Sequence, residues 1–211
     1  MIAAGRSRLK GMLTEEIKKA REEEGLIFSR TFENEEVKET DARGAEFDTV
    51  VFTGCRFENC DFTGVSFVNV ELKNCLFAGC KFQNGYWKNV KVSDCKAEGS
   101  IFSNAVFKWV SLKQSQLGYG NFSQTLWEFC EAEECSFQDA FLSEVRLKKT
   151  RFSKADFTGA DFFMTSLKGL DLSDSILEHI TVSDSYRELA GLKVNMFQAA
   201  ELAKLMGIKI V

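Results

Sequence analysis

Apolar residues, most of them large, recur at every fifth position of this chain, from Phe47 to Val182. The series continues for 28 consecutive positions without an insertion or a polar residue, which chance does not produce. An α-helix repeats every ~3.6 residues and a flat strand every ~2, so neither has this period. The five-residue repeat therefore has to be explained before any helix or strand is assigned.

A second, mostly small residue precedes each large one by two positions, as Cys60 precedes Phe62 and Ala105 precedes Phe107. Residues two apart along an extended chain lie on the same face, so each repeat places one large and one small side chain inward. Because the period is odd, the chain must turn once per repeat to keep both columns inside. Glycine and asparagine recur two positions after the large residue, where they tolerate the positive φ of a type II turn.

Four such turns would close a four-sided coil of 20 residues, although a three-sided coil is also compatible with the period. A four-sided coil sets Trp87 opposite Ala97, and close packing requires such a pairing of a large with a small residue. Neighbouring coils would then pair as parallel strands ~4.8 Å apart. We therefore expect an all-β solenoid, a quadrilateral parallel β-helix of about seven coils.

The two ends of the chain have helical patterns instead. Near-helical spacing of apolar residues over 6–24 predicts an amphipathic helix that stops at Gly25. Near the C-terminus, Asn195 is expected to cap a second helix, with Gln198 as its reciprocal partner and Gly207 as terminator. We expect three segments: an N-terminal helical segment over 1–31, the repeat β-helix over 32–185, and a C-terminal helix and tail over 186–211.

Composition excludes several classes of function. The net charge of −4 argues against direct binding to nucleic acid. No apolar run approaches the ~18 residues of a membrane span, and the first residues lack the apolar core of a secretory signal, so we expect a cytoplasmic protein with no membrane contact. The single histidine, His179, falls at a turn position without a partner. We therefore expect neither an enzyme nor a cofactor.

Seven cysteines raise the question of a metal or disulfide framework. Their closest spacing is C-x4-C, whereas zinc sites use C-x2-C, and an odd count in the cytoplasm argues against disulfides. Cys55, Cys75, Cys95 and Cys135 fall on one expected face. We expect small buried thiols and no metal site.

The A/C-x-F/L-x-x pattern over residues 45–185 resembles the pentapeptide repeat family, which forms right-handed quadrilateral β-helices. Residues 95–107, 166–175 and 189–211 resemble the quinolone-resistance (Qnr) branch of that family. The resemblance implies a DNA-mimicking homodimer, joined through the C-terminal helix, that binds DNA gyrase and topoisomerase IV and protects them from fluoroquinolones or modulates their activity. The repeats run without a break, whereas surface loops interrupt those of the Gram-negative members. The chain therefore looks more like the loop-free relatives, whose effect on gyrase ranges from protection to inhibition.

Charge is uneven along the repeats. Residues 45–127 hold 7 acidic and 8 basic residues, whereas residues 128–184 hold 12 and 6. A DNA mimic would use such an acidic region, although each carboxylate could equally belong to an ordinary solvated face. The candidate partner-binding carboxylates are Glu131, Glu133, Glu134, Asp139, Asp156, Asp161, Asp171 and Asp174.

Trp109 and Phe129 stand 20 residues apart at turn positions, so a four-sided coil would stack them on one exposed edge. They are candidates for recognition, or they simply pack on each other. The expected dimer contacts are Leu202, Leu205, Met206, Ile208 and Ile210. The alternative function is a pentapeptide-repeat scaffold whose partner is not a topoisomerase.

Overall fold

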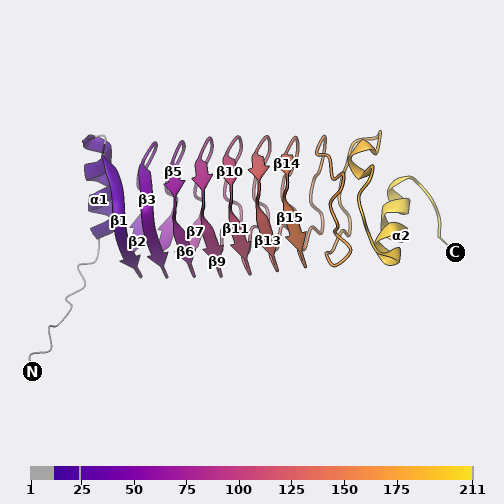
Figure 1. Ribbon diagram of the computed structural model, residues 1–211, viewed down its shortest axis with the longest axis horizontal. Coiled ribbons are helices and arrows are strands. Elements are labelled where there is room, and N and C mark those ends of the chain that lie inside the picture. The colour runs from indigo at the N-terminus through magenta and orange to yellow at the C-terminus, as the bar shows by residue number, and fades with distance from the viewer. Residues whose placement is uncertain (1–11, 24, 211) are drawn as a thin grey trace, which may run out of the picture.

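The computed structural model describes residues 12–23 and 25–210. It is a rod of stacked coils with a helix at each end (Figure 1). The helices are α1 (Met12–Glu22), the short 3-10 helix η1 (Arg187–Leu189) and α2 (Met196–Leu205). The strands are β1 (Leu26–Glu33), β2 (Glu36–Lys38), β3 (Glu46–Thr53), β4 (Arg56–Glu58), β5 (Ser66–Val68), β6 (Glu71–Lys73), β7 (Leu76–Ala78), β8 (Tyr86–Lys88), β9 (Lys91–Ser93), β10 (Val106–Lys108), β11 (Ser111–Lys113), β12 (Leu126–Glu128), β13 (Glu131–Glu133), β14 (Arg146–Lys148) and β15 (Arg151–Ser153).

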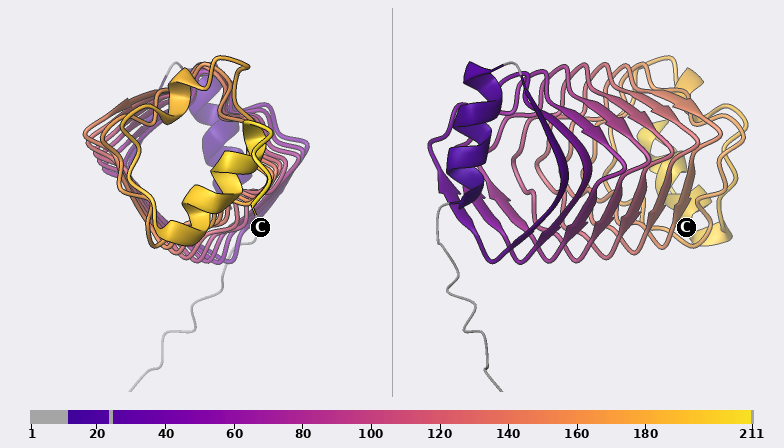
Figure 2. Two further views of the ribbon diagram at one scale, coloured as in Figure 1. Left: turned by 90° about the vertical axis from the view of Figure 1, so that its right-hand side faces the viewer. Right: turned by 60° about the vertical axis from the view of Figure 1, so that its left-hand side comes forward.

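Each strand from β1 to β13 pairs in parallel with the chain 20 residues further on, as Phe47 pairs with Phe67 and Phe67 with Trp87. This offset equals four five-residue repeats. The coil accordingly has a four-sided outline along the axis (Figure 2), which confirms the quadrilateral solenoid and excludes three sides. Pairing already begins with β1, where Ile27 lies opposite Phe47, so the solenoid extends ahead of residue 32 into the segment that we expected to be helical.

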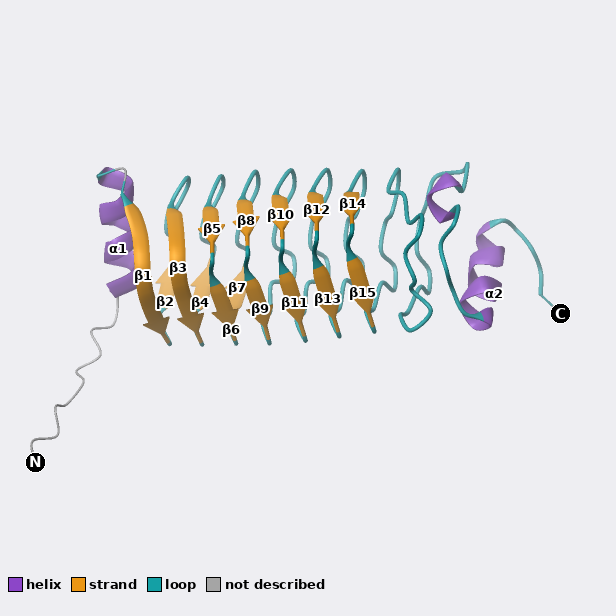
Figure 3. Cartoon of the chain, in the orientation of Figure 1, coloured by secondary structure: helices purple, strands orange, loops and turns teal. Residues whose placement is uncertain are grey.

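The four sides of the coil, faces A to D, differ in the strands that they hold. Face A holds the first half of β3 with β5, β8, β10, β12 and β14; face B holds the second half of β3 with β6, β9, β11, β13 and β15. Face C holds β2, β4 and β7 and continues as single bridges, while face D has single bridges only, such as Asp41 to Asp61. Figure 3 shows the strands of faces A and B lying across the rod and stacked in two rows along its axis.

Each corner from residue 29 to residue 169 places one residue in the left-handed region, and glycine or asparagine often occupies it, as expected. Bulky side chains adopt the same conformation: φ is 52° at Trp109 and 56° at Phe129. Hydrogen bonds between coils hold these corners, since the Trp109 N–H donates to the Glu128 carbonyl at 2.9 Å. The stacking of coils therefore imposes the turn even where the residue does not favour it.

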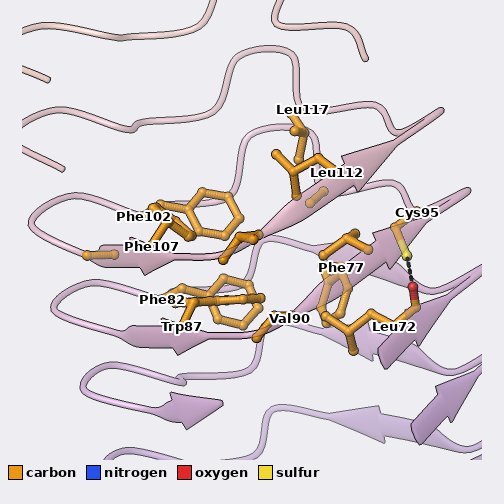
Figure 4. Packing of buried hydrophobic residues seen from close by; sticks show 14 of the residues in the cluster. Leu72, Phe77, Phe82, Trp87, Val90, Cys95, Phe102, Phe107, Leu112 and Leu117 are labelled. Atoms are coloured by element: carbon orange, nitrogen blue, oxygen red, sulfur yellow. Dashed lines mark hydrogen bonds between the residues drawn. The ribbon is translucent and has the colours of Figure 1, made fainter. Parts of the chain in front are cut away.

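The interior is filled by stacked aromatic rings (Figure 4). Phe102 and Phe122 lie 4.7 Å apart between centroids and are inclined by only 4°, and Phe57 stacks on Phe77 in the same way. A cavity of about 30 Å³ remains on the axis, and its lining is entirely apolar. Trp87 and Ala97 both line this cavity from faces A and C, which confirms the expected pairing of a large with a small residue.

The small inward residue two positions before a tryptophan decides whether the buried indole N–H finds a hydrogen-bond partner. Trp127 donates from Nε1 to the Thr125 hydroxyl, two residues before it, at 3.0 Å. Trp87 is preceded instead by Gly85, and its buried Nε1 has no partner among the described residues. A Cβ at Gly85 would lie 3.0 Å from that nitrogen, so the indole occupies the space that a side chain at 85 would need.

Both ends of the rod are covered. Helix α1 buries Leu13 and Ile17 against the first coil; the expected start of this helix at residues 6–11 lies outside the described residues. Helix α2 begins with the expected capping box of Asn195 and Gln198 and is followed by Gly207 at a φ of 77°. The Gln198 side chain also donates to the Leu172 carbonyl at 2.8 Å, tying α2 to the last coil.

Candidate partner-binding surfaces

The eight candidate carboxylates do not form one acidic face. Glu131 and Glu133 lie on β13, with Glu134 at the following corner, and Asp171 and Asp174 belong to the same side of the rod two coils further on. We call these five residues on face B the acidic cluster. The other three lie elsewhere: Asp156 is on face C, Asp139 at the corner after face C, and Asp161 on face D.

Ion pairs between coils offset part of the charge of the acidic cluster. Lys113 binds Glu133 at 3.0 Å, and Lys154 binds Glu134 at 3.0 Å. The hydrogen bond from Lys154 is the main reason why the pKa of Glu134 is lowered. Glu131 is exposed and lies opposite Arg151 in the strand register. The acidic cluster therefore forms a mixed-charge ladder with the neighbouring coils.

Three of the aspartates also have a local structural role. Asp156, Asp161 and Asp171 each accept a hydrogen bond from the backbone N–H two residues further on, for example from Thr158 N at 2.9 Å. Such side-chain bonds stabilise turns. This role was not predicted from the sequence; its signal is an aspartate directly before the large residue of a repeat.

The expected aromatic edge is present. Trp109 and Phe129 stack with centroids 5.5 Å apart and planes 6° from parallel. They are 50% and 39% exposed, so the stack faces solvent. The Lys149 ammonium lies 4.7 Å from the centroid of the Phe129 ring, within the range of a cation–π contact.

The residues expected at a dimer contact fall into two groups. Leu202 and Leu205 are partly buried and pack against the core, next to a groove of about 270 Å³ between α2 and the chain before it. Met206, Ile208 and Ile210 are exposed.

The first turn of α2 adds two exposed apolar side chains, Met196 and Phe197, which are 76% and 78% exposed. These two residues were not among the predicted contacts. The signal is a helix with apolar residues on more than one side.

All seven cysteines are free and buried, as expected. Burial raises the pKa of Cys130 and Cys135 to about 11, so these thiols stay protonated at neutral pH and are unreactive. Among the described residues, no group of three or more His, Cys, Asp or Glu side chains could hold a metal ion. His179 is exposed at a corner with φ of 56°.

Comparison with family models decides the family. A model of pentapeptide repeats, in 8 copies, matches residues 38–69, 45–84, 129–162 and 140–178. The chain is a pentapeptide-repeat protein. The matched residues lie in the stacked coils, where the five-residue period was read from the sequence.

The fold is shared with a solved structure, and other solved structures show a weaker likeness. A trypsin-treated form of QnrB1, a plasmid-mediated fluoroquinolone resistance protein, is 21% identical, with a TM-score of 0.54 over 88% of this chain and 97% of that one. HetL from Nostoc sp. strain PCC 7120 is 14% identical (TM-score 0.35; 85% and 91% covered). A pentapeptide repeat protein from the Arabidopsis thaliana thylakoid lumen is 15% identical (TM-score 0.42; 66% and 81% covered).

No curated protein sequence matches this pentapeptide-repeat chain. In its described part, no helix has the length and hydrophobicity needed to cross a membrane.

Proposed function

We propose that this pentapeptide-repeat protein is a Qnr-like DNA mimic that binds the type II topoisomerases DNA gyrase and topoisomerase IV and protects them from fluoroquinolones or modulates their activity. The likeness to QnrB1, a fluoroquinolone resistance protein, extends over nearly the whole of both chains and supports this function. The protein would act in the cytoplasm, by binding rather than by catalysis.

The observation that carries the proposal is the acidic cluster on a straight, rigid rod. Neighbouring coils are ~4.8 Å apart. Glu131, Glu133 and Glu134 lie in one coil, and Asp171 and Asp174 lie two coils further on. Duplex DNA carries one negative charge per ~1.7 Å of axis. The acidic cluster, whose charge Lys113 and Lys154 partly offset, is more dilute than that. A basic groove that accepts DNA would still attract this face, because complementary potentials steer association.

A homodimer through α2 and the tail would strengthen the mimicry. Joining two rods end to end would place two copies of the acidic cluster on either side of the two-fold axis, since Asp171 and Asp174 belong to the last coils. The exposed Met206, Ile208 and Ile210 supply apolar area for this contact. The doubled rod would measure roughly 70 Å, the length of about two turns of duplex DNA.

A supercoiling assay with purified gyrase, with and without ciprofloxacin, tests the proposal. We expect micromolar protein either to restore supercoiling in the presence of the drug or to inhibit gyrase in its absence. Glu131→Gln/Glu133→Gln/Glu134→Gln should weaken the effect about tenfold, because it removes three charges of the acidic cluster.

The matched control is Glu36→Gln/Glu58→Gln/Glu98→Gln, which removes the same charge from face C and should retain the effect. If gyrase is neither inhibited nor rescued, and no binding is detected at micromolar protein, the topoisomerase proposal is refuted. The chain would then be a scaffold for a different partner.

A further inference from the structure

Face A has the opposite charge from the rest of this acidic protein. Its outward and corner positions over five coils lie at 86–89, 106–109, 126–129, 146–149 and 166–169, and we call this surface the basic face. It holds one carboxylate, Glu128. Its positive residues are Lys88, Lys108, Arg146, Lys148, Lys149 and Lys168.

Folding of the rod does not account for this array of charge. On face B, lysines pair with glutamates of the next coil, as Lys113 does with Glu133. Among the described residues, the basic face has one ion pair, between Lys108 and Glu128 at 3.4 Å. Lys88 and Lys108 lie directly opposite each other in the strand register, an arrangement of like charges that destabilises a sheet.

Apolar side chains accompany the charges. Tyr86, Val106 and Leu126 follow one another in register on the outer side of β8, β10 and β12. Tyr86 is exposed, and Val106 and Leu126 are half-buried. The stack of Trp109 and Phe129 borders the same surface at its corner. Aromatic side chains beside a positive surface are typical of protein-binding sites.

The ring geometry favours a polypeptide over a nucleic acid. Phe129 has one ring face on Trp109 and the other under the Lys149 ammonium. The stack therefore leaves at most one open ring face, which is the face of Trp109 toward Asn89. Nucleobases stack on open ring faces, so this edge offers little to a nucleic acid. The exposed ring edges can instead contact aliphatic and aromatic side chains of a peptide.

We propose that the basic face binds an extended, acidic polypeptide segment of a partner protein that also carries aliphatic or aromatic side chains. Its carboxylates pair with Lys88, Lys148 and Lys168, and its apolar side chains contact the Tyr86 strip and the edge of Trp109. Five coils span ~19 Å, which about six residues of extended chain cover. This surface is distinct from the acidic cluster on face B, so it stands whether or not the protein binds gyrase.

The full-length protein can be titrated against a fluorescein-labelled peptide of about eight residues, alternating glutamate and leucine, with fluorescence anisotropy as the readout. We expect saturable binding that weakens as salt is added. The same peptide with glutamine for glutamate should bind at least about fivefold more weakly.

Two matched charge variants locate the site. Lys88→Gln/Lys148→Gln on the basic face should weaken binding about fivefold. Lys81→Gln/Lys96→Gln removes the same charge from the exposed outer side of faces D and C and should leave binding unchanged. Equal weakening by both pairs would contradict the proposal.

Trp109 gives a second readout, because it is exposed whereas Trp87 and Trp127 are buried. Peptide binding should therefore shift the exposed component of the tryptophan emission. Trp109→Asn should fold, since asparagine occupies the same corner column at 69 and 89, and should reduce binding. No saturable binding of the labelled peptide up to about 1 mM, or tighter binding of a single-stranded oligothymidine of similar length, would overturn the proposal.

Discussion

Phe122→Ala is expected to lower the free energy of unfolding by about 3–5 kcal/mol. The ring of Phe122 is buried, stacks on Phe102 and makes edge contacts with Trp127 and Phe137 at 5.9 and 5.8 Å between centroids. It also lines the axial cavity, so its removal enlarges an existing void. The Phe122 N–H donates to the Phe141 carbonyl of the next coil, and the neighbouring Asn121 N–H donates to the Ser100 carbonyl of the preceding one, which prevents the site from collapsing.

Phe141→Ala is the matched control, because Phe141 lies on the same face of the next coil but points outward and is 52% exposed. Its loss should change stability by less than about 0.5 kcal/mol. Guanidinium unfolding, followed by both circular dichroism and tryptophan fluorescence, measures both effects. Similar losses for the two variants would show that the inward column does not carry the stability of the rod.

Ile208→Asp/Ile210→Asp is expected to convert a homodimer into monomers without unfolding the rod. Both side chains are about half exposed in the single chain, so charging them costs little there. In an apolar contact, two buried carboxylates should raise the dimer dissociation constant at least about 100-fold. Sedimentation velocity at micromolar concentration measures the change.

The structure makes this pair a cleaner test than Leu202→Asp or Leu205→Asp, because both leucines pack partly against the core and their substitution would also loosen α2. Phe163→Asp, an exposed apolar site on face D, is the control and should leave the dimer intact. A double variant that still sediments as a dimer would place the contact elsewhere, and a wild-type monomer would refute the dimer.

The five-residue period predicts most of the fold, since it specifies which residues point inward and every side chain inside must fill a fixed volume. It also assigns residues to faces: Glu131 and Asp171 are two coils apart and share face B. The charges were counted over ranges of sequence and not face by face. The prediction therefore missed the separation of the acidic residues into faces, and it also missed the basic face. The corner residues were less informative, because hydrogen bonds between coils impose a left-handed φ on Trp109 as well as on glycine.

The two ends were harder to predict, because the period fades there. Ile27 already lies in register with Phe47, but one apolar residue does not distinguish a strand from the end of a helix. The last coil pairs with residues outside the repeat: the Leu172 N–H donates to the Lys193 carbonyl at 3.0 Å. No repeat pattern predicts such a contact.

Competition between this protein and duplex DNA for gyrase tests the central claim most directly. Fluorescently labelled duplex DNA bound to purified gyrase is titrated with the full-length protein, and the titration is repeated at increasing DNA concentration. A DNA mimic must displace the labelled DNA completely, with an apparent dissociation constant that rises in proportion to the DNA concentration and with salt. Formation of a ternary complex, in which gyrase holds DNA and protein together with unchanged affinity, would contradict the account.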